Sequence, residues 1–416
     1  MATACGSVPR ETSPSPVRPV PTVTVPFELP VTIAISGRLD DQTQAILDVQ
    51  IAQFEEQNPD IKVAFIAAPR KEANRHRRFS AQLATGDTSA DVYAFDPIWL
   101  SEFDANGWLT HLDAYAQTQN IKLDEFLPST IQANTVDGHL VALPWFADGG
   151  LLYYRRDLLE KYGYDPPDMW DELQKIALDI MAKEDLPYGF VWQGTPNESL
   201  TCNTLEFVWA HGGDVLDVNA NAIFDSPETR SALHQMSDLV TQGVSPPDVT
   251  SFNENRALSA FQSGDAVFMR NWAYAWNRLV GADSPLAGQV GLAPLPASCL
   301  GGQSLALSAH SLHPEQAFRF MSFLVGANQQ LLLARQANQT PSLASVYLEP
   351  ELLAQDPAYA GLYAALSTSR PRPQSPAYLA ISEAIFSETH TMLMGEQDVA
   401  AAVANIQRRI EAAIPQ

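Results

Sequence analysis

The sequence predicts an α/β protein, and three observations lead to this prediction. Runs typical of strands alternate with runs typical of helices from residue 31 onward, which indicates βαβ units and a mainly parallel sheet. Apolar residues make up 46% of the chain, enough to fill a large core. The length of 416 residues corresponds to two or three domains of about 150 residues each.

The individual elements follow from the period of the apolar residues. Runs rich in β-forming residues predict strands at 31–35, 61–65, 91–95, 151–154 and 266–269. A helical period predicts helices at 72–85, 156–162, 173–180, 204–212, 228–242, 254–263, 314–335 and 397–413. Another helical face is formed by Leu47, Ile51 and Phe54, and Asn58-Pro59 ends that helix.

Charge and missing motifs limit the functions open to the chain. Lys and Arg number 25 and Asp and Glu 48, and the net charge of −23 repels phosphate backbones, so nucleic acid is not an expected partner. No run is long and apolar enough to span a bilayer. A phosphate loop, a dinucleotide fingerprint and a nucleophile elbow are all absent. His310 and His313 lack a third ligand nearby, so we expect neither a metal nor a cofactor.

The N-terminus predicts a location outside the cytoplasm. Small residues before Cys5-Gly6 resemble the end of a bacterial lipoprotein signal, in which the cysteine receives the lipid. The proline-rich stretch 7–30 favours an extended spacer. We therefore expect residues 1–30 to anchor a periplasmic or extracytoplasmic protein to the membrane. A chance cysteine is the alternative, because the charged and apolar parts of a signal are absent and Ala2 stands where the pattern prefers leucine.

Five segments, in order, resemble the extracellular solute-binding proteins of bacterial sugar ABC transporters, particularly the trehalose/maltose-binding branch. They are LPWFAD at 143–148, GLLYYRRDLLEKYG at 150–163, WDEL at 170–173, FQSGDAVFMRNW at 261–272 and PEQAFRFMSFL at 314–324. The resemblance covers roughly residues 31–416 and implies a type II-like periplasmic-binding-protein fold. In that fold two α/β lobes are joined by hinge segments and enclose a ligand cleft. The implied lobes are 31–142 plus 303–342 and 146–298 plus 346–416.

The resemblance also implies a transport function. The protein would capture a neutral di- or oligosaccharide or a sugar-like osmolyte and deliver it to a membrane permease, as a monomer and without catalysis. Trehalose, maltose, sucrose and glucosylglycerol all remain open. One alternative is the same fold with a non-sugar solute, such as glycerol phosphate or a polyamine. Another is a glycoside hydrolase that uses Asp96 and Asp148, although nothing in the sequence marks the buried, apolar-flanked acid that hydrolysis requires.

A sugar needs hydrogen-bond acceptors around its rim and flat aromatic rings against its faces. Asp96 ends a strand, where ligands bind in open α/β sheets, although an Asp-Pro pair also makes an ordinary helix N-cap. Asp148 lies between the aromatic pair Trp145-Phe146 and two glycines. The resemblance assigns the sugar hydroxyls to this aspartate and stacking to the preceding aromatic residue. A turn aspartate is the alternative.

Further candidates lie later in the chain. Trp272 and Tyr274 match aromatic residues of the family's cleft and would share a face on an extended segment, with core packing as the alternative. Arg372 and Tyr378 lie in a segment that returns to the cleft, where an arginine offers a planar fork of donors. Arg370 competes for this role.

The weaker candidates are Gly302, Gln303 and Asp41. The resembling branch commonly carries Gly-Gly-Trp where this chain has Gln303, so the amide suggests a smaller or more polar ligand than a standard disaccharide. Asp41, next to Asp40, is weak because paired acids are usually solvated.

The chain has three cysteines. In an oxidising compartment we expect Cys202 and Cys299 to lie near enough to pair, which leaves Cys5 for the lipid.

Overall fold

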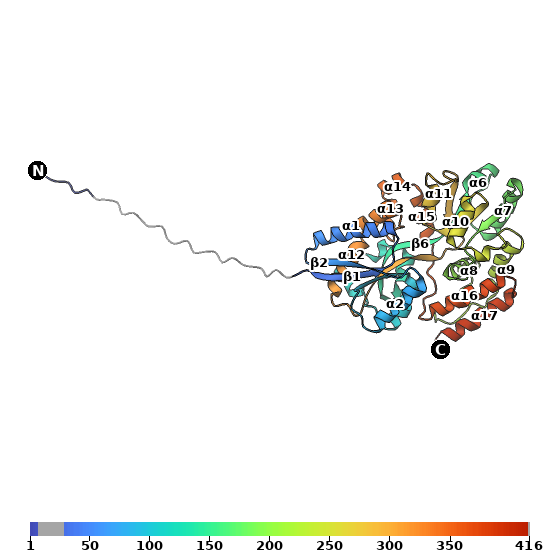
Figure 1. Ribbon diagram of the computed structural model, residues 1–416, viewed down its shortest axis with the longest axis horizontal. Coiled ribbons are helices and arrows are strands. Elements are labelled where there is room, and N and C mark those ends of the chain that lie inside the picture. Colours follow the sequence, from blue (N-terminus) through green and yellow to red (C-terminus); the bar gives the residue numbers. More distant parts are fainter. Residues whose placement is uncertain (7–28, 415–416) are drawn as a thin grey trace.

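The computed structural model describes residues 1–6 and 29–414. From Val31 onward the chain forms a mixed sheet with helices around it (Figure 1). The described sheet has eight strands in the order β2-β1-β3-β10-β6-β8-β7, and β9 pairs with β6. These strands are β1 (Val31–Gly37), β2 (Ile61–Ala67), β3 (Val92–Phe95), β6 (Ala142–Arg155), β7 (Tyr188–Val191), β8 (Ala266–Trp272), β9 (Val290–Pro294) and β10 (Leu300–Leu307). A separate ribbon consists of β4 (Thr135–Val136) and β5 (His139–Leu140).

Helices cover both ends of this sheet. Those before β6 are α1 (Asp41–Gln57), α2 (Glu72–Ala84), α3 (Leu100–Ala105), α4 (Asp113–Thr118) and α5 (Pro128–Ala133). Those between β6 and β10 are α6 (Arg156–Tyr162), α7 (Trp170–Glu184), α8 (Glu198–Ala210), α9 (Pro227–Thr241), α10 (Glu254–Gln262) and α11 (Ala275–Val280). The last are α12 (Pro314–Leu324), α13 (Ala327–Ala337), α14 (Pro350–Gln355), α15 (Ala358–Ser367), α16 (Tyr378–Leu393) and α17 (Val399–Ala413). In Figure 1, α1, α2 and α12 surround the half that holds β1 and β2, and α7, α9 and α17 lie in the other half.

Two strands, β6 and β10, connect the halves. The first part of β6 pairs with β10, which in turn pairs with β3. The last part of β6, from Gly150 onward, pairs with β8 and β9 instead. Polar side chains near the middle of β6 therefore lie at the junction between the halves.

The structure corrects three expectations about these elements. The sheet is mixed rather than mainly parallel, because β10 and β6 run antiparallel to their neighbours. The helix expected at 314–335 is divided into α12 and α13 by Gly326, whose extended backbone (ψ 151°) interrupts the helical turns. The strand expected at 151–154 is only the end of the longer β6. The other expected strands and helices are present, with shifted ends.

Among the described residues, no helix combines the length and the apolar character that crossing a bilayer requires.

Candidate functional site

The centre of the candidate site is the place where β6, β10 and β8 meet. Asp148 lies opposite Gly301 in the pairing of β6 with β10, and Gly150 lies opposite Trp272 in the pairing of β6 with β8. A Cβ atom on Gly301 would stand 3.1 Å from Cζ3 of Trp272 and 3.5 Å from the Cβ of Asp148. The glycine thus lets the indole ring and the carboxylate come together over β10.

Asp148 is held by two backbone donors. Its Oδ1 accepts hydrogen bonds from the N–H groups of Gly149 (2.8 Å) and Ala273 (2.9 Å). Burial raises the pKa of Asp148 to about 6, although these hydrogen bonds and the nearby Arg270 favour the ionised form. Its Oδ2 accepts no hydrogen bond from the described residues and is available to a ligand hydroxyl.

The half-buried indole of Trp272 rests on a buried ion pair. The guanidinium carbon of Arg270 lies 4.1 Å from the ring centre. Arg270 donates to both carboxylate oxygens of Glu206, at 2.6 and 3.0 Å, and both side chains are buried. After Trp272 the chain turns, and Tyr274 adopts helical angles just before α11, so the expected strand alternation does not relate these two rings. Burial raises the pKa of the half-buried Tyr274.

Arg372 joins two carboxylates from distant parts of the chain. It donates to Oδ1 of Asp96 at 2.6 Å and to Oε1 of Glu198 at 2.9 Å, and its side chain is 3% exposed. The hydroxyls of Tyr378 and Ser382 also donate to Glu198. Burial opposes the charge on Arg372, but Asp96 and the other acidic neighbours raise its pKa above the usual value. In this cluster one guanidinium therefore pairs with two carboxylates.

The ends of two strands position the carboxylates of this cluster. Asp96 follows β3 and caps the short 3-10 helix Pro97–Trp99, accepting from the N–H of Ile98 at 3.1 Å, so its capping and site roles coexist. Glu198 begins α8 after the N-cap Asn197, in the segment that follows β7. Sequence reasoning missed Glu198, although the signal that marked Asp96, a polar cap after a buried strand, recurs there.

Three other charged residues near the site were also missed. Arg38 directly follows β1, and Glu72 and Arg75 lie in the first turns of α2. Partial burial, together with Asp96 and Glu198, raises the pKa of Glu72 to about 7, while part of its side chain stays exposed. Burial lowers the pKa of Arg75, and the charge of Arg38 acts in the same direction. The available signal was the position of Arg38 directly after a β-rich run.

A cavity of about 640 Å³ borders this cluster. It lies between α2 and α3 on one side and α8 and α16 on the other, and Glu72 and Glu198 are among its lining residues. It is large enough to admit a sugar-sized molecule. The described residues contain no group of three or more His, Cys, Asp or Glu side chains placed to hold a metal ion.

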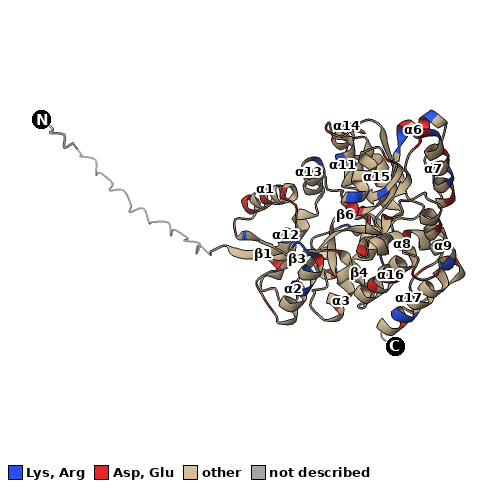
Figure 2. Ribbon diagram, turned by 45° about the vertical axis from the view of Figure 1, so that its right-hand side comes forward, with Lys and Arg blue, Asp and Glu red and all other residues tan. Residues whose placement is uncertain are grey.

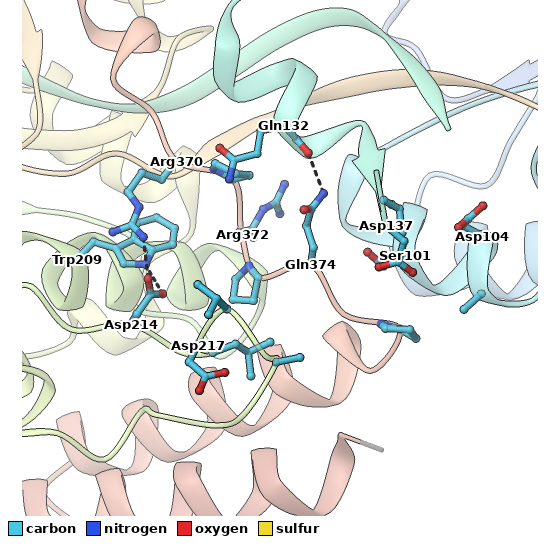
Figure 3. A pocket seen from close by; sticks show the side chains of 18 residues that line it. Ser101, Asp104, Gln132, Asp137, Trp209, Asp214, Asp217, Arg370, Arg372 and Gln374 are labelled. Carbon is cyan, nitrogen blue, oxygen red and sulfur yellow. Dashed lines mark hydrogen bonds and ion pairs between the residues drawn. The ribbon is translucent and has the colours of Figure 1, made fainter. Parts of the chain in front are cut away.

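A second cavity, of about 380 Å³, is lined by the proline-rich segment 370–376 together with residues of α3, α5 and the loop after α8 (Figure 3). Arg370 pairs there with Asp214 at 2.8 Å, and Gln374 donates to the carbonyl of Gln132 at 2.9 Å. Arg370 therefore has a carboxylate partner of its own and does not share those of Arg372.

Several sequence candidates have structural roles. Trp145 is fully buried in the core, whereas Phe146 and Asp148 are half-buried, and the pairing of β6 with β10 shifts register at this point. Gly302 has a φ of +111°, and a Cβ there would lie 2.3 Å from the carbonyl oxygen of Phe146, so this position requires glycine. The amide nitrogen of Gln303 donates to the carbonyl of Arg38 at 3.4 Å.

The two acids after β1 differ in role. Asp40 is the N-cap of α1 and accepts from the N–H of Thr43 at 2.8 Å. Asp41 is exposed in the first turn of α1, where its negative charge interacts favourably with the helix dipole.

Cys202 and Cys299 lie close together, as expected, but both are free thiols in the structure. The sulfur atoms of Cys202 and Cys299 are 2.6 Å apart in a buried environment, and both residues are free cysteines. Burial raises the pKa of Cys202. Cys5 is exposed. The disulfide and the lipid modification both stay predictions.

Comparison with known proteins identifies the family. Residues 39–331 match the family model described as bacterial extracellular solute-binding protein. The chain belongs to this family. The family is one of proteins that act outside the cytoplasm, and the resemblance found in the sequence is confirmed.

Relatives and solved structures of this family agree with the assignment. A probable ABC transporter-binding protein of Deinococcus radiodurans is 33% identical over 347 residues, which cover 80% of this chain and 81% of that protein. The structure of maltose-bound MalE3 of T. maritima is 39% identical, with a TM-score of 0.80 over 92% of this chain and 99% of that one. The sugar-binding protein MalE of Xanthomonas citri has a TM-score of 0.82 at 23% identity, covering 92% and 97% of the two chains. The expected two-lobed binding-protein fold is therefore confirmed, whereas the exact lobe boundaries stay a prediction.

Proposed function

We propose that this solute-binding protein captures a neutral di- or oligosaccharide, with maltose as the first ligand to test, and delivers it to the membrane permease of an ABC importer. The observation that carries the proposal is the pairing of a free carboxylate oxygen on Asp148 with the half-buried indole of Trp272 at the junction of the halves. A carboxylate accepts the hydroxyls of a sugar rim, and an indole packs against the C–H face of the ring. The maltose-bound relative at 39% identity supports the choice of maltose.

The charges of the cluster favour a neutral ligand over glycerol phosphate. The buried guanidinium of Arg372 is already paired with Asp96 and Glu198, so it has no net positive charge to offer a phosphate. Asp148 adds a carboxylate nearby. A phosphate would therefore have to pair with other cations near the site, such as Arg38 and Arg75, rather than with Arg372.

Membership of a solute-binding family supports transport over the hydrolase alternative. The raised pKa of Asp148 is a property that a general acid also has, so the alternative needs its own test. Incubation of the protein with maltose, followed by an assay for released glucose, separates the two functions. Glucose release that disappears in Asp148→Ala would support hydrolysis.

The other parts of the proposal concern location and partners. We propose that Cys5 carries a lipid that keeps the protein at the membrane, and that the protein acts as a monomer. Intact-mass analysis of protein isolated from membranes, compared with Cys5→Ala, tests the lipid. Size-exclusion chromatography with light scattering tests the monomer.

Ligand binding is tested by thermal shift against maltose, trehalose, sucrose, glucosylglycerol, mannitol, glycerol phosphate and spermidine, followed by calorimetry. A ligand that binds only the native state raises its stability once the concentration exceeds Kd. Asp148→Ala should weaken maltose binding about tenfold to hundredfold, because a charge-assisted acceptor is lost. The exposed Asp283→Ala is the control and should bind as the wild type does. A shift with glycerol phosphate or spermidine alone would reject the sugar.

A further inference from the structure

Positive charge is concentrated in one segment of an otherwise acidic protein. Five of the nine residues from 70 to 78 are Lys or Arg, in a chain whose net charge is −23. The segment leads into α2 and forms its first two turns, and Figure 2 shows α2 in the half of the molecule that contains β1. We call Arg70, Lys71, Arg77 and Arg78 the basic rim.

The cations of the basic rim have no carboxylate partner among the residues that the structure describes. None of them forms an ion pair with a described carboxylate, whereas most other described Lys and Arg side chains do, among them Lys62, Arg155 and Arg335. Arg70, Lys71 and Arg77 are exposed, and Arg78 donates to the carbonyl of Ala67 at 3.2 Å. In a protein with about twice as many acids as bases, a group of unpaired cations leaves its charge available to an outside anion.

The basic rim borders the opening between the halves. Glu72, Ala73 and Arg77 line the cavity of about 640 Å³ that separates α2 and α3 from α8 and α16. Arg70 and Lys71 directly precede the first of these residues. Glu198, a partner of Arg372, also lines this cavity, so the cavity adjoins the charged cluster of the candidate site. A permease that receives a solute from this site must cover the opening.

We propose that the basic rim is a docking surface for an acidic segment on the outer face of the membrane permease. The inference rests on the proposed function, because only delivery of a solute brings the permease over the opening. An anionic lipid surface fits less well, since a flat membrane would also meet other parts of a protein whose net charge is −23 and repel them. A protruding protein segment can contact the basic rim alone.

The test uses the purified full chain, radiolabelled, and protoplasts of the bacterium that produces it, deleted for its own copy of the gene. Arg70→Glu/Lys71→Glu reverses two exposed charges that do not line the cavity. Lys175→Glu/Arg408→Glu makes the same change in net charge at two exposed cations that form no ion pair with any described carboxylate. We expect the wild type and this control to bind protoplasts alike, and Arg70→Glu/Lys71→Glu to bind at least about tenfold more weakly.

Further arms separate the sources of the anion. Binding of the wild type should weaken with added salt and disappear after protease treatment of the protoplasts. Equal binding by Arg70→Glu/Lys71→Glu and the wild type, or no binding by the wild type, would overturn the proposal. Equally strong binding to vesicles made from the extracted lipids would assign the rim to the membrane instead. Calorimetry of the same wild-type protein with maltose tests the proposed function separately, so a failure there is distinguishable from a failure of docking.

Discussion

Replacing Asp148 with asparagine should stabilise the ligand-free protein while weakening its ligand binding. Burial raises the pKa of this carboxyl from 3.8 to about 6, so the folded state holds a proton that the unfolded chain has already released. At 1.36 kcal/mol per unit, this difference of about 2 units corresponds to about 3 kcal/mol of lost stability when the group is ionised. Partial exposure of the side chain reduces the effect, so we expect Asp148→Asn to raise the free energy of unfolding by about 1–3 kcal/mol at pH 7.

The raised pKa of Asp148 also determines how the stability of the protein changes with pH. Between about pH 4 and pH 6 the folded state binds more protons at Asp148 than the unfolded state does, so this residue makes the wild type less stable as the pH rises. Asp148→Asn removes that contribution, and the two proteins should therefore diverge in stability across this window. Urea unfolding at pH 4, 5, 6 and 7 measures the difference, and Asp283→Asn is the control. A constant difference between wild type and variant, or equal stability at pH 7, would refute the reasoning.

Three further predictions concern the surroundings of this carboxylate. Trp272→Ala should keep its fold and lose at least about tenfold in maltose affinity by calorimetry, since buried tryptophans dominate many recognition sites; unchanged affinity would remove Trp272 from the site. Arg372→Ala leaves two carboxylates without their cation and should lower the free energy of unfolding, measured with urea, by about 3–5 kcal/mol. Arg372→Lys should recover part of this loss. A loss below about 1 kcal/mol would contradict the role of Arg372 as the centre of the cluster. Mild oxidation should form a disulfide between Cys202 and Cys299, which closes a loop of 97 residues and raises the free energy of unfolding by up to about 4.7 kcal/mol. Thiol counting that still finds both cysteines free would contradict the pairing.

Much of the fold could be predicted because burial leaves a period in the sequence. Leu47, Ile51 and Phe54 predicted a helix that the structure contains as α1. The division of the helix expected at 314–335 was missed because the apolar residues continue on both sides of Gly326, and only its backbone angles reveal the break. The order of the strands in the sheet could not be predicted either, because nothing in the local sequence indicates that β3 pairs with β10.

The site was predicted as far as single positions allow. The sequence singled out Asp96 because it follows a buried strand and Asp148 because it precedes a glycine pair, and their roles in binding stay predictions. Trp145 was grouped with them although it is fully buried, because an aromatic pair on a strand does not reveal which member faces the core. Glu198 was missed since its role depends on a partner, Arg372, that lies 174 residues away.

The pairing of β10 with both β3 and β6 has a consequence for how the protein acquires its structure. The strand that lies between β3 and β6 in the sheet is made long after both of them, since Ser304 is the partner of Phe95. An emerging chain therefore cannot complete the half that holds β3 before β10 has been synthesised, and until then β3 and the first part of β6 lack this neighbour. Such a chain is expected to stay incompletely folded during synthesis, a condition suited to export in an unfolded form, and a fragment that ends before Leu300 should expose these edges and aggregate.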